Sequence, residues 1–565
     1  MKPETPAQTL DRKLHVLAAP FTASLSPVSL ALAWADWAWH LAGSPGRQIE
    51  LAGRAAELGV QTLSCALGQG SCELPAGATD DDPRFRAAEW AQWPFNLLRQ
   101  GFRQQEQFWH EAASLPGMSP HHVQMARFFA RQWLGMLTPA NGLLTNPVVL
   151  KDALSSGGAH LLQGAQHWLQ DLSGAHEPAP QGAFQVGRDV AVTPGQVVMR
   201  NHLVELLRYA PQTPQVHPEP VLIVPSWIMK YYILDLSPHN SMVRWLVGQG
   251  HTVYMLSWRN PGAEDAGLSM DDYLEQGVFE PLRWLGQHHR AGVHLAGYCL
   301  GGTLAAIAAA AATRGLGGAL PSLASLTLFA AQTDFSEPGE LGLFIDESQV
   351  GFLDSLTREQ GYLSGEQMAG SFQFLHSREL VWTRRMREYL MGEREQPSDL
   401  MAWNADTTRL PARMHHQYLT ALYLRNALAI GRYRVQGQPI SLSDLRLPLF
   451  LVGTERDHIS PWPSVYKLHH LCEADATFVL AAGGHNAGIV SEPGHAHRHY
   501  RIAHRAPGAA WVAAEAWPAQ AELKEGSWWP AWQAWLQARS GKPHRARALP
   551  ASKLGPAPGE YVLQA

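Results

Sequence analysis

A short glycine-rich stretch between two apolar segments constrains the fold of this chain more than any other feature. The run VHLAG, residues 293–297, is followed by Tyr-Cys-Leu-Gly-Gly and then by an alanine-rich segment. A cysteine with glycine two positions before and two positions after it, between a strand and a helix, is typical of the sharp turn called a nucleophile elbow. The pattern predicts that Cys299 lies on such a turn at the edge of a sheet.

Short apolar, β-branched runs alternate with helical segments after about residue 184. This alternation is typical of an α/β fold with a mostly parallel sheet. Together with the elbow, it predicts an α/β-hydrolase-type catalytic domain over residues 184–565. A long stretch without strand signals, residues 334–434, interrupts the series, and its length predicts a cap or lid insertion. The predicted strands span 220–226, 251–258, 293–297, 325–331, 447–453 and 476–484.

The first part of the chain has a different pattern. The segments FNLLRQGFRQQEQFWHEAA, from Phe95, and HVQMARFFARQWLGML, from His122, place apolar residues at helical spacing. A stretch rich in Pro and Gly, SGAHEPAPQGAFQVG, ends this part. We therefore expect a mainly helical N-terminal domain over residues 1–183.

Composition and charge narrow the classes of partner. Hydrophobic residues make up 46% of the 565 residues and the formal net charge is −5, so we expect neither disorder nor a nucleic-acid partner. Four cysteines without a CxxC pair indicate neither a disulfide framework nor a metal site. The N-terminal segment has neither the pattern of a signal peptide nor an apolar run long enough for a membrane span. We expect a cytoplasmic protein.

Two further loops carry side chains that can work with the cysteine. Ligands of open parallel sheets bind beyond the carboxyl ends of the strands, where Asp457 follows LPLFLVG and His485 follows ATFVLAAGG. The chain order nucleophile, acid, histidine is that of α/β-hydrolase-type enzymes. His485 can withdraw the thiol proton of Cys299, and Asp457 can orient the imidazole and support its positive charge. We therefore predict a catalytic triad of Cys299, Asp457 and His485.

Two backbone N–H groups are candidates for an oxyanion hole. One belongs to Leu300, directly after the cysteine, and the other to Ile228 in the loop PSWIMK after the first predicted strand. The helix N-terminus after Cys299 favours the thiolate. Because a thioester on cysteine stays activated for attack by an alcohol, cysteine in place of serine favours acyl transfer over hydrolysis.

Each assignment has an alternative. Cys299 could be an inert buried thiol, and Asp457 could cap a helix that starts near Pro461. Asp334, after the run LFAAQT, is a second acid at a strand end. The histidines of GHAHRHY could suggest a metal, but neither a nearby cysteine nor an H-x-x-x-H pattern accompanies them. We prefer the triad with Asp457 as its acid, and we expect no metal.

Many long blocks resemble the polyhydroxyalkanoate synthases, the enzymes that polymerise (R)-3-hydroxyacyl-CoA into storage polyester. The resemblance covers nearly the whole chain beyond about residue 80. The elbow block GYCLGGT looks most like the class I, single-subunit type, which prefers short-chain monomers. Other matching blocks are DDPRFRAAEW, PFNLLRQ, LTPANGLLTNP, FQVGRDVAVTPGQVVMRNHLVELLRYAP, KYYILDLSPHNS, GHTVYMLSWRNP, WNADTTRLPARMHHQYL, DHISPW and GSWWPAWQAWL.

The resemblance implies roles for the same side chains. Cys299, deprotonated by His485, takes the acyl group from CoA, and Asp457 assists attack by the hydroxyl end of the nascent polyester. It also implies a homodimer at cytoplasmic polyester granules with granule-associated proteins, and neither a metal nor a bound cofactor. Ser226 stands where the family usually has proline, and Asn486 where it usually has an apolar residue. These departures bear on activity level and substrate range.

Three functions compete for this fold. The first is the polyester polymerase. The second is a hydrolase or depolymerase, in which water is the acceptor and serine is expected at the elbow. The third is a non-catalytic granule-associated protein, which predicts a degraded triad. We prefer the polymerase, because the chain has cysteine at the elbow and all three triad residues.

Overall fold

The structure, a computed structural model, describes residues 5–19, 22, 24–68, 82–173, 183–368, 382–549 and 552–565. These residues form two compact units. The larger unit comprises the described residues of 1–17, 181–368 and 397–565, and the smaller unit those of 18–180 and 369–396. The stretch expected to form a cap is therefore divided between the two units. The domain limits expected from the sequence stay predictions.

The smaller unit is helical. Several of its helices begin with proline at the first position and a Ser or Asn side chain that caps the first turn, as Ser26, Ser119 and Asn146 do. The helical segments expected from Phe95 and His122 are α4 and α5. The helices of this unit are α2 (Pro27–Ala42), α3 (Pro45–Ala66), η2 (Pro83–Phe85), η3 (Ala88–Ala91), α4 (Phe95–Ala112), α5 (Pro120–Met136), η4 (Pro139–Asn141), α6 (Pro147–Ser155), α7 (Ala159–Leu172) and η10 (Met386–Leu390).

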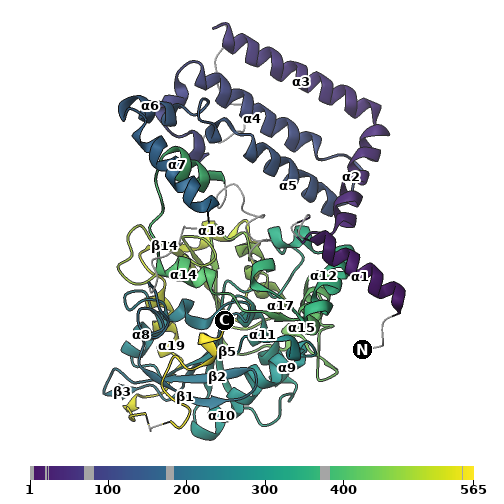
Figure 1. The fold of residues 1–565 in the computed structure, drawn as a ribbon. Helices are drawn as coiled ribbons and strands as arrows, with labels where there is room; N and C mark the ends of the chain where they lie inside the picture. The colour runs from purple at the N-terminus through teal and green to yellow at the C-terminus, as the bar shows by residue number, and fades with distance from the viewer. Residues whose placement is uncertain are drawn as a thin grey trace. The chain divides into compact units, whose positions relative to one another are not determined.

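Ten strands of the described residues form one sheet in the larger unit, in the order β1-β2-β5-β4-β6-β7-β12-β13-β14-β15. Figure 1 labels β1, β2, β5 and β14 of this sheet. The six central strands, from β5 to β13, run parallel, and the strands at both margins pair antiparallel. These six are the strands expected from the sequence, so the mostly parallel sheet is confirmed. The strands are β1 (Gly195–Arg200), β2 (Val204–Tyr209), β4 (Val221–Val224), β5 (Val253–Trp258), β6 (Val293–Tyr298), β7 (Leu323–Phe329), β12 (Leu449–Thr454), β13 (Ala476–Ala481), β14 (His499–Arg505) and β15 (Glu522–Glu525).

The central strands form the core of this unit. Every residue of β4, β5, β6, β12 and β13 is buried, so both faces of these strands are covered. The tryptophans of α19 are buried against the sheet. Trp532 Nε1 donates a hydrogen bond to Thr327 Oγ1 on β7 at 3.0 Å. Burial on both faces explains why these strands are continuous apolar runs in the sequence.

The remaining elements of the larger unit surround this sheet. Three small pairs of strands lie outside it: β3 (Gln215–Val216) with β16 (His544–Arg545), β8 (Tyr362–Leu363) with β9 (Leu410–Pro411), and β10 (Arg434–Val435) with β11 (Gln438–Pro439). The helices are α1 (Pro6–Ala18), η5 (Tyr231–Asp235), α8 (Met242–Gly248), η6 (Ala263–Asp265), α9 (Met270–Leu274), η7 (Glu275–Phe279), α10 (Glu280–His288), α11 (Leu300–Thr313), η8 (Glu340–Phe344), α12 (Glu347–Gln360), α14 (Asp399–Ala405), α15 (Ala412–Tyr418), η11 (Leu419–Leu424), η12 (Leu442–Asp444), α16 (Trp462–Tyr466), α17 (Leu468–Leu471), α18 (Trp517–Gln520), α19 (Trp529–Gln537) and η13 (Tyr561–Leu563).

The cysteines and the helices bear on two expectations from composition. Cys299 and Cys472 are free thiols, whereas Cys65 is disulfide-bonded, which the sequence analysis did not expect. Cys72 lies outside the described residues. Among the helices that the structure describes, none combines the length and the apolar character needed to cross a membrane.

Four histidines of the larger unit are buried in their neutral form. Burial is the main cause that lowers the pKa of His251 and His469 to about 3, and that of His294 and His415 to about 4, from the usual 6.5. Repulsion from the positive charges of His217 and His294 lowers the pKa of His251 further. Both ring nitrogens of His251 lack a hydrogen-bond partner within the described part of the chain.

These histidines predict that the fold loses stability in mild acid. Each folded-state pKa lies below 6.5, so below pH 6.5 the unfolded chain binds more protons and stability falls. Between pH 6.5 and 5.5 we expect the free energy of unfolding to drop by about 4–5 kcal/mol, roughly 1 kcal/mol for each of these four groups and less for the half-buried His289, whose pKa is also lowered to about 4. Urea unfolding followed by tryptophan fluorescence at the two pH values measures this drop.

A single substitution provides the control. Leucine at His251 removes one proton-binding group without breaking a described hydrogen bond, so His251→Leu should reduce the drop by about 1 kcal/mol. Equal unfolding free energies at pH 6.5 and 5.5 in the unchanged protein would contradict the prediction.

Candidate active site

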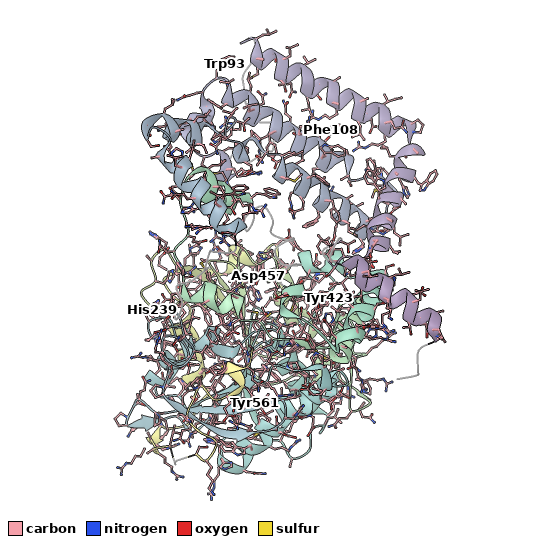
Figure 2. The ribbon with its side chains drawn as sticks, in the orientation of Figure 1. Trp93, Phe108, His239, Tyr423, Asp457 and Tyr561 are labelled. Atoms are coloured by element: carbon pink, nitrogen blue, oxygen red, sulfur yellow. The ribbon has the colours of Figure 1, made fainter. Side chains whose placement is uncertain are left out.

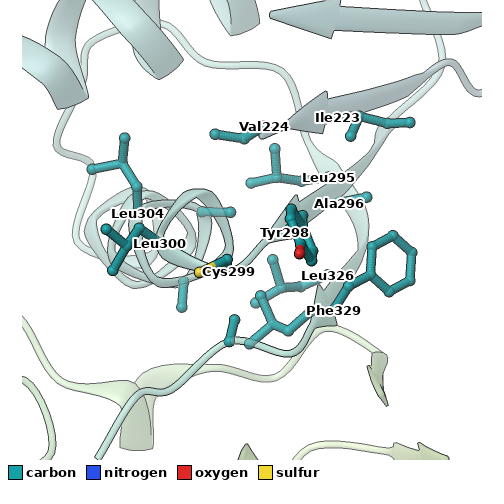
Figure 3. Packing of buried hydrophobic residues seen from close by; sticks show 14 of the residues in the cluster. Ile223, Val224, Leu295, Ala296, Tyr298, Cys299, Leu300, Leu304, Leu326 and Phe329 are labelled. Carbon is teal, nitrogen blue, oxygen red and sulfur yellow. The ribbon is translucent and has the colours of Figure 1, made fainter. Parts of the chain in front are cut away.

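Cys299 lies on the tight turn between β6 and α11 (Figure 3). Its backbone has φ 52° and ψ −127°, a conformation that is strained for a residue with a side chain. The surrounding backbone holds it there. The N–H of Cys299 donates to the carbonyl oxygen of Phe329 at 2.9 Å, and its own carbonyl accepts from the N–H of Gly302 at 2.9 Å. The strand, turn and helix thus fix the direction of the thiol.

The glycines of the elbow allow strand and helix to approach closely. A Cβ atom at Gly302 would lie 2.5 Å from the Cβ of Ala331, and one at Gly297 would lie 2.5 Å from the Cα of Gly302. A Cβ at Gly301 would overlap the backbone carbonyl oxygens of Val224 and Pro225. The first turn of α11 therefore packs directly on the loop that follows β4.

His485 and Asp457 form a buried pair at the carboxyl ends of β13 and β12. His485 Nδ1 donates to Asp457 Oδ2 at 2.7 Å. The other carboxylate oxygen accepts from the backbone N–H groups of Ile459 at 2.9 Å and Ser460 at 2.8 Å. Asp457 therefore does both things considered from the sequence: it caps the following turn and it binds the imidazole.

Opposite electrostatic effects meet at this pair. Burial acts to raise the pKa of Asp457, but the charge of His485 and the hydrogen bonds to the carboxylate hold it below its usual value. Burial acts to lower the pKa of His485, but the charges of Asp457 and Cys299 and side-chain hydrogen bonds to both raise it well above 6.5. The pair thus favours the charged form of His485 beside the Asp457 carboxylate, and this raised pKa offsets a small part of the acid destabilisation described above.

Asp334, the other acid at a strand end, has different partners. Its Oδ1 accepts from the N–H of Ser336 at 2.8 Å and from Asn426 Nδ2 at 2.9 Å. Asn426 Oδ1 in turn accepts from the N–H of Phe335 at 2.9 Å. Asp334 therefore ties the loop after β7 to the segment that follows η11, whereas Asp457 is the carboxylate that His485 binds.

The two oxyanion candidates come from segments that touch. Leu300 is the first residue of α11, where backbone N–H groups have no partner within the helix. Ile228 follows β4, in the loop on which Gly301 packs. The carbonyl of Ile228 accepts from the N–H of Thr408 at 3.1 Å. The carbonyl of Trp227 accepts from the hydroxyl of Thr408, so Thr408 holds this loop through both its backbone and its side chain.

Residues 403–408, which we call the strap, hold the segment that follows Ile228 in the same way. Trp403 Nε1 donates to the carbonyl oxygen of Lys230 at 2.7 Å, and the Tyr232 hydroxyl donates to Asp406 Oδ2 at 3.0 Å. With Thr408, three strap residues therefore bind the chain between Trp227 and Tyr232.

Ser226 and Asn486, the two residues that depart from the family pattern, have different surroundings. The hydroxyl of Ser226 is buried without a hydrogen-bond partner among the described residues. Asn486 Oδ1 accepts from the Tyr298 hydroxyl at 2.6 Å, and the Tyr298 ring lies 5.6 Å from that of His485. Asn486 thus supports the histidine through Tyr298. Sequence reasoning missed Tyr298, and its position next to Cys299 in the elbow was the available signal.

Metal binding was the other alternative. Among the described residues, no three His, Cys, Asp or Glu side chains are grouped so that they could hold a metal ion. The expected absence of a metal and of a cofactor stays a prediction.

The chain matches three protein-family models and is similar in sequence to several known proteins. Residues 81–246 match the poly-beta-hydroxybutyrate polymerase N-terminus family, residues 5–47 the poly-beta-hydroxybutyrate polymerase N-terminal family, and residues 219–492 the alpha/beta hydrolase fold. A poly(3-hydroxyalkanoate) polymerase of Methylorubrum extorquens is 37% identical over 496 residues, which cover 85% of this chain and 80% of the relative. The chain belongs to the poly(3-hydroxyalkanoate) polymerase family. The expected α/β-hydrolase-type fold is also confirmed.

A second relative of the poly(3-hydroxyalkanoate) polymerase family extends the match. The polymerase subunit of Cupriavidus necator is 36% identical over 517 residues, which cover 88% of this chain and 86% of the relative. The hydrolase-fold match contains Cys299, Asp457 and His485. The family resemblance inferred from the sequence blocks is therefore confirmed.

Proposed function

We propose that this chain transfers (R)-3-hydroxyacyl groups from CoA thioesters through Cys299 onto the hydroxyl end of a growing polyhydroxyalkanoate, with release of CoA. One observation carries this proposal: a cysteine on a strained turn, next to a buried His485–Asp457 pair with a 2.7 Å hydrogen bond, in a chain of the polymerase family. Cysteine suits transfer because its thioester remains activated toward alcohols.

In the first step, Cys299 is loaded. His485 takes the proton of the thiol, and the thiolate attacks the carbonyl carbon of the acyl-CoA. The N–H groups of Leu300 and Ile228 stabilise the oxyanion of the tetrahedral intermediate. The carbon–sulfur bond to CoA then breaks, and the CoA thiolate takes the proton back from His485. The products are an acyl thioester on Cys299 and free CoA.

In the second step, the acyl group moves to an alcohol. His485, oriented by Asp457, removes the proton of the hydroxyl at the end of the chain, and the oxygen attacks the thioester on Cys299. The bond to sulfur breaks, an ester forms, and the proton held by His485 returns to the thiolate. The polyester is longer by one unit and the thiol is regenerated.

The same proposal covers partners and location. Several tryptophans of the smaller unit are exposed, among them Trp34, Trp39, Trp93 and Trp133, and Figure 2 shows Trp93 on this unit. Exposed aromatic side chains can contact an apolar surface. This supports contact with the surface of a polyester granule. The proposal further includes a cytoplasmic homodimer, granule-associated proteins as partners, and activity without a metal or cofactor.

The test is release of CoA from (R)-3-hydroxybutyryl-CoA by the unchanged protein and by Cys299→Ala. We expect CoA release with insoluble polyester, and a loss of at least about 10⁴-fold in the variant, because alanine cannot form the thioester. Thermal unfolding of both proteins controls for folding. Release of CoA with free 3-hydroxybutyrate would indicate a hydrolase or depolymerase, and no release from either protein a non-catalytic granule-associated protein.

A further inference from the structure

Two tyrosines on the helix that follows the strap are hydrogen-bonded to each other. The hydroxyl of Tyr418 donates to that of Tyr423, with 3.1 Å between the oxygens. In an α-helix, side chains five residues apart point about 140° away from each other. Here α15 ends at Tyr418 and continues as the π-helix η11, in which the N–H of Arg425 donates to the carbonyl of Thr420 at 3.2 Å. The wider π-turn brings both hydroxyls to one face.

This face is turned toward the nucleophile and the loops beside it. The ring of Tyr418 contacts Trp227 edge-on, with centroids 6.0 Å apart, and the ring of Tyr423 lies 4.8 Å from Phe335. Trp227 precedes Ile228 in the loop after β4, and Phe335 belongs to the loop after β7. Cys299 lies close enough for its charge to act on both phenol groups. Figure 2 labels Tyr423, which like Asp457 belongs to the larger unit.

Both phenols are hydrogen donors at neutral pH. Burial is the main cause that raises the pKa of Tyr418 and of Tyr423 above 10, and the charge of Cys299 raises both further. Because Tyr418 gives its hydrogen to Tyr423, the hydrogen of Tyr423 is left for another acceptor. The side chain of Tyr423 also keeps part of its surface accessible.

Further unused polar atoms lie on the loop after β7. Gln332 Nε2 and Thr333 Oγ1 are buried and have no hydrogen-bond partner in the described ranges of the chain. The carbonyl of Gln332 accepts from the Thr303 hydroxyl in the first turn of α11 at 2.7 Å, which places this loop beside the elbow. Buried polar groups without partners are costly, so these two atoms are available to a ligand that carries oxygen atoms.

We propose that Tyr423, oriented by Tyr418, donates its hydrogen to the 3-hydroxyl oxygen of the acyl group bound at Cys299. This bond selects acyl groups that carry oxygen at position 3 over plain alkyl acyl groups. The inference rests on the proposed function, since it names what that site recognises. A site built to bind a substrate hydroxyl discriminates against the analogue that lacks it.

The test compares two thioesters in single-turnover loading of Cys299 with enzyme in excess. Both (R)-3-hydroxybutyryl-CoA and butyryl-CoA can acylate the thiol and release one CoA, but butyryl-CoA has no 3-hydroxyl. We expect Tyr423→Phe to slow loading from the hydroxylated thioester about tenfold and to change loading from butyryl-CoA by less than about twofold. Tyr418→Phe should slow the first reaction about threefold.

Tyr433→Phe is the matched control, because it removes the hydroxyl of another buried tyrosine outside the site. It should leave both rates unchanged. If the unchanged protein is loaded but Tyr423→Phe leaves the ratio of the two loading rates unchanged, for example by slowing both equally, the role of Tyr423 is overturned and the proposed function is not. No loading of the unchanged protein by either thioester would overturn the proposed function and this inference with it.

Discussion

Replacing His485 with glutamine is expected to slow the loading of Cys299 by CoA thioesters about 10³- to 10⁴-fold. Glutamine keeps a similar size and can still contact Asp457, but it cannot take the thiol proton. It also removes the cation that the buried Asp457 carboxylate faces. Single-turnover release of CoA from (R)-3-hydroxybutyryl-CoA measures the loading step separately from elongation.

Asp457→Asn is the matched comparison within the same pair. Asparagine leaves the imidazole in place but does not support its positive charge, so slow loading should remain while elongation falls. The length and rate of formation of the polymer report elongation. Loading by His485→Gln at a rate close to that of the unchanged protein, or normal polymer from Asp457→Asn, would show that these residues do not have the proposed roles.

Replacing Gly301 with alanine is expected to remove most activity and to lower the free energy of unfolding by about 3 kcal/mol. The new Cβ would overlap the backbone carbonyls of Val224 and Pro225, and backbone atoms cannot move aside as a flexible side chain can. Relief of the overlap requires α11 to shift away from the loop after β4. Such a shift separates the N–H groups of Leu300 and Ile228, which the proposed mechanism needs together. CoA release and urea unfolding measure the two effects.

Gly351→Ala is the control for the general effect of alanine in place of glycine. Gly351 lies in α12, is exposed, and has no atom within 4 Å of the added Cβ. Alanine there should stabilise the protein by about 0.5–1 kcal/mol and leave activity unchanged. Similar stability and activity changes at Gly301 and Gly351 would contradict the steric account of the elbow.

The central sheet could be predicted from the sequence because burial leaves a strong signal. Strands that are covered on both faces, such as β5 and β12, contain almost nothing but apolar residues. The antiparallel margins gave a weaker signal. β14 contains His, Tyr and Arg, and β15 is ELKE with most of its side chains exposed, so the patterns of both resemble those of surface loops. Their position comes from pairing with β13, which is a long-range contact.

Candidate site residues could be predicted from the sequence where they directly follow a strand. They could not be predicted where a π-helix, instead of an α-helix, determines which side chains share a face. Asp457 and His485 could be proposed because the loops after parallel strands meet at one edge, and their catalytic roles stay a prediction. In the structure the carboxylate hydrogen-bonded to His485 is that of Asp457, whereas Asp334 accepts from Asn426. Tyr418 and Tyr423 are five residues apart, a spacing that in an ordinary helix separates two side chains. Only the π-turn brings them together, and the sequence has no reliable sign of it.

The strap controls when the backbone donor of Ile228 is held in place. Trp403, Asp406 and Thr408 all bind the chain segment that begins with Trp227 and carries Ile228. If this strap moves away from that segment, those bonds break and the backbone donor of Ile228 loses its support. The proposed oxyanion hole is then incomplete for as long as the strap is displaced. Water that reaches the site in that state would meet the proposed Cys299 thioester without the backbone donor that its cleavage needs.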